Sequence, residues 1–329
     1  MRCLALAQAW QSRGGRAVFA VSTITPALEA RLHSERFEIV RLSAAQGFIE
    51  DANEASQLAL KRGASWIVVD GYHFGSEYQK IVKESGMHLL FVDDCGHADR
   101  YYADLVLNQN LHARESLYKS RESYTNLLLG TTYALIRREF LEWVGRKSNV
   151  PKIAGKVLVT MGGSDPENMT LKVIQALNSV EIPGLTALIV AGGSNLHYED
   201  LRSEVEKSVH EIVLKKDVQN MPELMAWADI AIASGGSSIW ELALMGVPII
   251  GLARARQEFQ LLERTTKCGI TISLGYYKYI DIDKISKTFA RLAADKIMRL
   301  EMSKIGRSMI DGLGPARIIR SMLNERSVI

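Results

Sequence analysis

Short apolar runs alternate with longer amphipathic stretches along almost the whole chain. The runs are rich in Val, Ile and Leu without polar alternation, which is typical of strands buried on both faces of a parallel sheet. They cover residues 17–21, 39–42, 66–69, 89–92, 105–107 and 127–129, and then 157–160, 187–190, 212–214, 230–233, 247–252 and 270–273. Helical patterns such as 50–62, 168–177 and 239–245 lie between them. This repetition predicts an α/β fold of doubly wound parallel sheets.

The length of 329 residues favours two domains. The polar stretch Arg146–Gly155, which contains Pro151, separates two series of strands and helices. We therefore expect an N-terminal domain at 1–148 and a C-terminal domain at 149–329. A helix after the break at Gly312–Pro315 could pack back on the first domain.

The N-terminus does not follow the usual order. Residues Met1–Ser12 predict an amphipathic helix that ends at Gly14-Gly15. A doubly wound domain ordinarily opens with a strand, and the turn after that strand contacts the ligand. The pattern therefore predicts that the first strand of the N-terminal domain is missing.

Composition narrows the function classes. A formal charge of +3 is small for this length, so nucleic acid is not an expected partner. Cys3, Cys95 and Cys268 lie far apart without a CxxC motif, which fits a reducing cytoplasm. No apolar run approaches ~18 residues, so we expect no membrane insertion.

The segment Ala228–Pro248 carries the strongest chemical signal. A buried strand runs into Ser234-Gly235-Gly236-Ser237-Ser238 and then into a helix. Glycines allow close approach of a ligand, and the free N–H groups of a helix start favour phosphate. Glu241 could accept hydrogen bonds from a ribose diol. Alternatively, Ser238 and Glu241 form an S-x-x-E capping box with no ligand.

Two further glycine loops follow predicted strands. In the first, Gly162, Gly163 and Ser164 either contact the ligand or form a turn capped by Ser164 or Asp165, with Pro166 at the first helical position. Gly192–Ser194 is expected to be only a turn. None of these loops matches G-x-G-x-x-G or the P-loop pattern, which argues against dinucleotide and ATPase functions.

Polar residues in the first half gather where predicted strands end: Asp70, Tyr72, His73, Asp93, Asp94, His97 and Asn108–Asn110. Asp70, Tyr72, Asp94 and His97 are the catalytic candidates, and a loop histidine such as His97 can act as an acid or base near neutral pH. The pair Asp93-Asp94 also fits a turn and cap. Asp281 and Asp283 resemble a metal-binding DxD but fit a helix cap, so we expect no metal.

Several segments together resemble the UDP-sugar hydrolase of the pseudaminic acid pathway, a family related to the peptidoglycan N-acetylglucosaminyltransferase. They are MRCLALAQAW, VVDGYHFGSEY, FVDDCGHAD, NQNLH, LLLGTTYALIRREF, VTMGGSDPENMTLKV and ASGGSSIWELALMGVP. The resemblance extends over essentially the whole chain. It implies a GT-B fold, in which two Rossmann-like domains face a cleft.

The resemblance also implies a reaction: hydrolysis of UDP-2,4-diacetamido-2,4,6-trideoxy-β-L-altrose to free sugar and UDP in nonulosonic acid biosynthesis. The substrate is then a UDP-sugar, and no cofactor is expected. The helix start at Gly235–Ser238 would stabilise the leaving diphosphate. Glu241 would hold the ribose, and Gly162–Ser164 would face the ligand.

Two departures from the family pattern matter. The family begins with a strand and a G-x-G-H-x-x-R turn, whose histidine orients or deprotonates the attacking water. Met1-Arg2 corresponds to the end of that motif, so the histidine has no counterpart here, and we expect the true start to lie upstream. In Leu252–Gln257, Arg256 stands where the family usually has Asn, and its charge could contact a phosphate or carboxylate.

Two alternatives stay open. A GT-B glycosyltransferase would use the same UDP pocket but would need an acceptor surface, and a degenerate protein would bind the nucleotide sugar without turnover. The sequence decides neither the exact sugar nor the oligomeric state.

Overall fold

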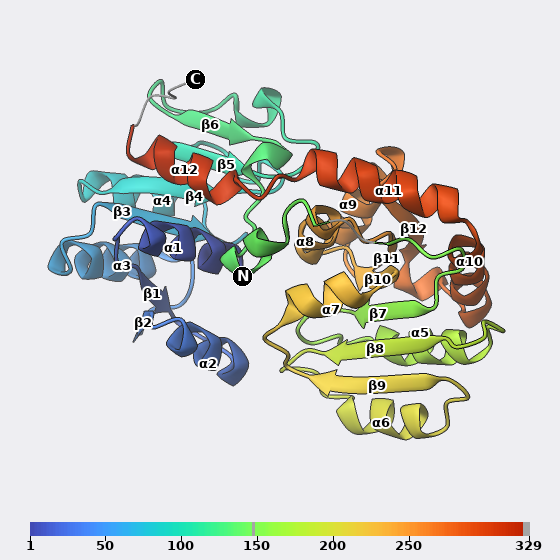
Figure 1. The fold of residues 1–329 in the computed structure, drawn as a ribbon. Coiled ribbons are helices and arrows are strands. Elements are labelled where there is room, and N and C mark those ends of the chain that lie inside the picture. Colours follow the sequence, from blue (N-terminus) through green and yellow to red (C-terminus); the bar gives the residue numbers. More distant parts are fainter. Residues whose placement is uncertain (147–148, 325–329) are drawn as a thin grey trace. The chain divides into compact units, whose positions relative to one another are not determined.

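The computed structural model describes residues 1–146 and 149–324. The chain forms two compact units. Unit 1 comprises Met1–Arg138 together with the C-terminal segment that begins at Gly312, and unit 2 comprises Glu139–Asp311. The units therefore divide ten residues before the expected boundary at 148, and the last helix belongs to unit 1 rather than to the C-terminal domain. This helix, α12 (Gly314–Met322), packs on α1 (Arg2–Ser12) through Ile318 and Ile319 (Figure 1).

Unit 1 contains two parallel sheets instead of one. The smaller pairs β1 (Val18–Val21) with β2 (Glu38–Arg41), and the larger has the order β3-β4-β5-β6. Its strands are β3 (Trp66–Asp70), β4 (His88–Val92), β5 (Leu105–Asn108) and β6 (Asn126–Leu129). The other helices are α2 (Pro26–Ser34), α3 (Ile49–Lys61), α4 (Ser76–Glu84) and the 3-10 helices η1 (Glu115–Tyr118), η2 (Thr131–Tyr133) and η3 (Arg138–Trp143), the last of which runs into unit 2.

Helix α1 contacts both sheets of unit 1. Leu6 packs in a cluster with Val68 of β3, whereas Leu4 packs in a cluster with Phe19 of β1. Within the described residues, the edges of β1 and β3 that face away from β2 and β4 have no ladder partner. The side chains of β1 and most of those of β3 are only half-buried, unlike the fully buried β5.

Unit 2 has one continuous parallel sheet in the order β12-β11-β10-β7-β8-β9. Its strands are β7 (Lys156–Thr160), β8 (Thr186–Ala191), β9 (Glu211–Lys216), β10 (Ile230–Ser234), β11 (Ile249–Ala253) and β12 (Thr271–Tyr276). Its helices are α5 (Met169–Asn178), α6 (Tyr198–Glu206), α7 (Met221–Trp227), α8 (Ser238–Met245), α9 (Arg256–Lys267), η4 (Tyr277–Tyr279), α10 (Ile282–Ala294) and α11 (Lys296–Met309). This order, with the reversal between β7 and β10, is doubly wound as predicted.

One buried cluster forms most of the core of unit 2. Alternate residues of the central strands, including Val157, Val159, Ile230 and Ile232, pack with Val173 of α5 and Phe289 of α10 in this cluster. The central strands are buried along nearly their whole length because helices pack against the sheet. The apolar runs without polar alternation therefore predicted these strands correctly.

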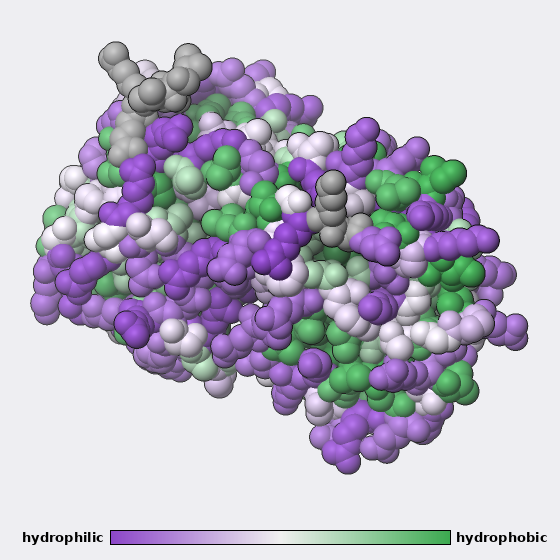
Figure 2. Space-filling view, in the orientation of Figure 1, coloured by the Kyte–Doolittle hydropathy of each residue, from purple (hydrophilic) through white to green (hydrophobic). Residues whose placement is uncertain are grey.

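Apolar residues are dispersed over the visible surface. On the face drawn in Figure 2, they lie in small groups among polar residues. Within the described residues, no helix is both long and apolar enough to span a bilayer.

The split sheet predicts uneven protection in unit 1. An isolated two-stranded sheet is marginally stable, and segments with half-buried side chains open more easily than core strands. In hydrogen exchange monitored by mass spectrometry, we expect peptides from β1 and β2 to exchange at least about tenfold faster than peptides from β4 and β5, after correction for intrinsic rates. Equal protection of the two sheets would contradict this, and β8 serves as a protected reference.

Candidate functional site

In unit 2, the predicted glycine loops meet at the carboxyl ends of three adjacent strands. Gly162 follows β7, and Gly235 and Gly236 follow its neighbour β10. The Oγ atom of Ser234 lies 3.7 Å from the point where a Cβ on Gly162 would be, and 3.9 Å from the same point on Gly236. The structure thus brings together the two loops that the sequence singled out as nucleotide-binding.

The third glycine loop, Gly192–Ser194, packs against the Gly162–Ser164 loop. A Cβ on Gly192 would overlap the backbone of Gly162 and Gly163, and the Ser194 amide donates to the Gly163 carbonyl at 3.1 Å. Gly192–Ser194 is therefore more than a turn, because it fixes the position of the Gly162–Ser164 loop.

Helix α8 begins directly after the Gly235-Gly236 turn. Its N-cap is Ser237, which makes no side-chain capping hydrogen bond, and Ser238 is already the first helical residue. The alternative of a capping box with Ser238 as the N-cap does not match this helix start. The Ile239 and Trp240 amides donate to the Gly236 and Ser237 carbonyls, both at 3.1 Å. What this end of α8 offers an anion is therefore the Ser238 amide and the positive end of the helix dipole. Glu241 lies in the first turn and is 9% exposed.

In the Gly162 loop, Asp165 has a structural role. Asp165 is buried, accepts from the amides of Met169 and Thr170 at 3.0 and 2.9 Å, and so caps α5. Helix α5 begins at Met169, not at Pro166 as the sequence suggested. Gly162 has a φ of 84°, a conformation that favours glycine.

In unit 1, three of the four catalytic candidates form one network around Arg2. The Arg2 guanidinium donates to both carboxylate oxygens of Asp70, at 2.6 and 3.2 Å, and to Asp94 at 2.6 Å. The Tyr72 hydroxyl donates to the other oxygen of Asp94 at 2.7 Å. Asn110 also donates to Asp94, at 2.7 Å. Asp70 ends β3, and Asp94 follows β4, so parallel pairing places them at one edge of the sheet.

Charge stabilises this network. Burial alone would lower the pKa of Arg2, but the carboxylates of Asp70 and Asp94 outweigh burial and raise its pKa above the ordinary value. Burial and the Asp94 carboxylate also raise the pKa of Tyr72, so its hydroxyl stays protonated and able to donate. The arrangement holds two carboxylates close together without leaving either unpaired.

His97 lies beside the network, with its ring centroid 5.9 Å from that of Tyr72. Its Nε2 lies 3.0 Å from the Phe74 carbonyl, and its Nδ1 lies 3.5 Å from Asp93. The Asp93 carboxylate beside Nδ1 raises the pKa of His97 despite partial burial. His97 is therefore a candidate to exchange a proton with a ligand.

Asp93 has a different role from Asp94. Its side chain accepts from the amides of Cys95 and Gly96 at 2.7 and 2.8 Å and from the Tyr101 hydroxyl. Burial alone would raise its pKa, but the hydrogen bonds from His97, Tyr101 and the backbone lower it to about 2. Asp93 is thus the turn-forming member of the pair.

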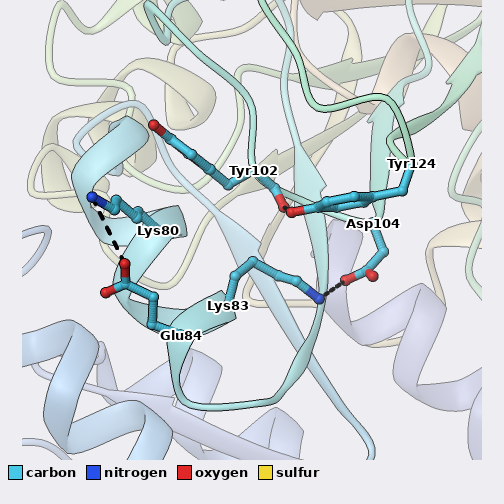
Figure 3. A pocket seen from close by; sticks show the side chains of 6 residues that line it. All are labelled: Lys80, Lys83, Glu84, Tyr102, Asp104 and Tyr124. Atoms are coloured by element: carbon cyan, nitrogen blue, oxygen red, sulfur yellow. Dashed lines mark hydrogen bonds and ion pairs between the residues drawn. The ribbon is translucent and has the colours of Figure 1, made fainter.

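Two other groups of residues resemble sites. Ligand atoms of Asp93, Cys95 and His97 lie within 4.8 Å of one another, as a metal site requires, but the hydrogen bonds of Asp93 account for this grouping. A hollow of about 420 Å³ lies at the opposite end of the larger unit 1 sheet. Its charged residues pair with each other, Lys83 with Asp104 at 2.6 Å and Lys80 with Glu84 at 3.7 Å (Figure 3).

Sequence reasoning missed Arg2 and Arg254. Arg2 is the first residue of α1, and it pairs with Asp70 and Asp94, which lie 68 and 92 positions further along the chain. No local sequence pattern indicates such pairs. Arg254 follows β11, and its Nη2 and Nη1 atoms lie 3.6 and 3.9 Å from the Cβ position of Gly162. The sequence drew attention to the nearby Arg256, which is exposed as the first residue of α9.

Comparisons with known proteins agree with this picture. Residues 157–260 match the Glycosyltransferase family 28 C-terminal domain. The chain is 25% identical over 242 residues to the spore coat polysaccharide biosynthesis protein SpsG of Bacillus subtilis, covering 73% of this chain and 70% of that protein. It is 24% identical over 242 residues to a Helicobacter pylori protein, covering 71% of this chain and 41% of that one. The latter is a pseudaminic acid cytidylyltransferase and UDP-2,4-diacetamido-2,4,6-trideoxy-β-L-altropyranose hydrolase.

Solved structures show the fold. The structure of MurG from Acinetobacter baumannii superposes with a TM-score of 0.66 at 13% identity, covering 98% of this chain and 95% of that one. The S. aureus MnaA–UDP structure gives 0.67 at 12% identity, with 98% and 93% coverage. The resemblance inferred from the motifs is thus confirmed: the chain has the GT-B fold of two Rossmann-like domains and is related to the H. pylori protein with the UDP-sugar hydrolase name.

Proposed function

We propose that the chain hydrolyses a UDP-linked diacetamido-trideoxy sugar to free sugar and UDP. The observation that carries the proposal is the meeting of Gly162, Ser234 and Gly236 beside the start of α8. This is a site for a diphosphate. The H. pylori relative, named for this hydrolysis, and the UDP-bound MnaA structure support the choice of nucleotide and reaction.

The reaction requires a stabilised leaving group and an activated water. The water oxygen bonds to the anomeric carbon, the bond from that carbon to the UDP oxygen breaks, and the water gives up a proton. N–H groups at the start of α8 would stabilise the charge that develops on the departing diphosphate. Glu241, in the first turn of the same helix, would hold the ribose.

The candidate acid–base groups for the proposed reaction belong to unit 1. Asp94 is the strongest candidate for a catalytic residue, because Arg2, Tyr72 and Asn110 fix its orientation through three hydrogen bonds. His97, whose pKa is raised by Asp93, would take or return a proton. Asp70 would then position Arg2 rather than react.

A glycosyltransferase is the second candidate. The match of residues 157–260 to a glycosyltransferase domain favours it, because the same nucleotide site would serve either reaction. A degenerate protein that binds without turnover is the third. The proposed setting is the cytoplasm, where nucleotide sugars are available. Release of free sugar from the UDP-sugar without an added acceptor distinguishes hydrolysis from the other two.

Blocking the Gly236 loop should abolish nucleotide binding without unfolding the chain. A Cβ on Gly236 meets only Ser234 Oγ, at 3.9 Å, so Gly236→Val leaves the fold intact but occupies the space for the diphosphate. We expect the Kd for UDP in calorimetry to rise at least about tenfold, which is ~1.4 kcal/mol. The control Gly155→Val, where a Cβ meets only the Gly184 carbonyl at 3.6 Å, should stay within about twofold of the wild type. Equal UDP affinity in both variants would refute the site.

Removing the charge of Asp94 should separate turnover from nucleotide binding. In Asp94→Asn we expect kcat for release of free sugar to fall at least about 100-fold, because general acid–base groups contribute about 10²–10⁴. The Kd for UDP should stay unchanged, because the nucleotide groups belong to unit 2. Asp104→Asn is the control, since Asp104 pairs with Lys83 at the other end of the same sheet. Wild-type turnover in Asp94→Asn would show that the network has no catalytic role.

A further inference from the structure

Arg254 reaches across the end of a neighbouring strand in unit 2. It follows β11, which pairs with β10, which in turn pairs with β7. Its guanidinium nevertheless lies beside Gly162, in the loop that follows β7. The Nη2 and Nη1 atoms are 3.6 and 3.9 Å from the point where a Cβ on Gly162 would be. Ser234 Oγ, at the end of β10, lies 3.7 Å from the same point. The positive charge therefore lies over the carboxyl end of β10.

Glu258 holds Arg254 in this position. Its Oε2 accepts from the Arg254 backbone amide at 2.8 Å and from Nε at 3.3 Å, and its Oε1 accepts from Nη2 at 2.6 Å. The two side chains are only 22% and 15% exposed. Among the contacts of the described residues, none involves Arg254 Nη1 as a hydrogen-bond donor. One edge of the guanidinium is thus used by Glu258, and the other remains available.

Glycine contacts fix the helix that carries Glu258. The Glu258 carbonyl lies 2.7 Å and its Cβ 2.9 Å from where a Cβ on Gly235 would be. A Cβ on Gly251 would overlap the Leu262 side chain one turn further along α9. Because α9 lies directly on these two glycines, the Arg254–Glu258 pair has a fixed position beside the Gly235–Ser238 turn.

We propose that Arg254 binds the diphosphate of the nucleotide and that Glu258 is its positioning residue. The inference rests on the proposed function, and it names the side chain that recognises the negative charge of the diphosphate. An arginine held along one edge presents its other N–H groups in a fixed geometry to phosphate oxygens, which a flexible surface side chain does not. The start of α8 offers a phosphate only partial positive charge, whereas the Arg254 guanidinium carries a formal charge, although it is paired with Glu258. This role belongs to Arg254, not to the exposed Arg256.

The test compares ligands that differ only in the number of their phosphate groups. We would measure the Kd of UDP, UMP and uridine by calorimetry for the wild type, Arg254→Met and the matched control Arg256→Met. Arg254→Met should weaken UDP about 10- to 100-fold, as expected for losing a charge-assisted hydrogen bond, and leave uridine within about twofold. Arg256→Met should bind all three ligands as the wild type does.

Glu258→Gln tests the positioning role. Looser placement of Arg254 should reduce the ratio of UDP to UMP affinity about threefold or more with uridine binding unchanged, a selective effect that a general loss of stability would not produce. If Arg254→Met fails to fold because Glu258 is left unpaired, the double variant Arg254→Met/Glu258→Gln removes that charge and should show the same selective loss of UDP.

The outcomes separate this inference from the proposed function. If the wild type binds UDP and Arg254→Met binds it equally well, the role of Arg254 is overturned while the nucleotide site stands. If Arg256→Met instead causes the selective loss, the assignment to Arg254 is likewise wrong. If the folded wild type binds no UDP, the proposed function fails, and with it this inference.

Discussion

Close backbone packing at glycines is the constraint on which the candidate nucleotide site depends. Gly192 packs on the backbone of Gly163, which fixes the loop after β7, and Gly235 packs on Glu258, which fixes the start of α9. A side chain at either position would push one wall of the site away. The start of α8 and the Arg254–Glu258 pair lie beside these short contacts. The glycines thus build the geometry as well as leaving room for a ligand.

Unit 1 relies on a different interaction, the ion pairs of Arg2. Two carboxylates at neighbouring strand ends would repel each other, and one guanidinium joins them into a single rigid group. The same helix that supplies Arg2 contacts both sheets of this unit. The split between the sheets therefore lies next to the candidate catalytic groups, and the half-buried β1 and β3 mark the part of the unit with the least packing.

Much of this architecture could be predicted from the sequence. Apolar runs without alternation indicated the buried strands, and the Gly-Gly-Ser loops after them indicated the edge where a ligand would bind. The helix cap at Asp281 was also correct, since its side chain accepts from the Lys284 amide at 2.7 Å. The roles of Arg2 and Arg254 could not be predicted, because Arg2 pairs with Asp70 and Asp94 and Arg254 lies beside Gly162, and these residues are far away in the chain. The supporting role of Gly192 was not predicted either, because it packs on Gly162 and Gly163, which are also far away in the chain.

Both proposals require that unit 2 binds uridine diphosphate. Calorimetry of the wild-type chain with UDP, with GDP and NAD as comparators, measures this binding, and circular dichroism would establish that the protein is folded. We expect one UDP site per chain, with GDP and NAD binding at least about tenfold more weakly. A folded chain that binds no UDP, or binds all three ligands equally, would show that unit 2 is not a UDP site.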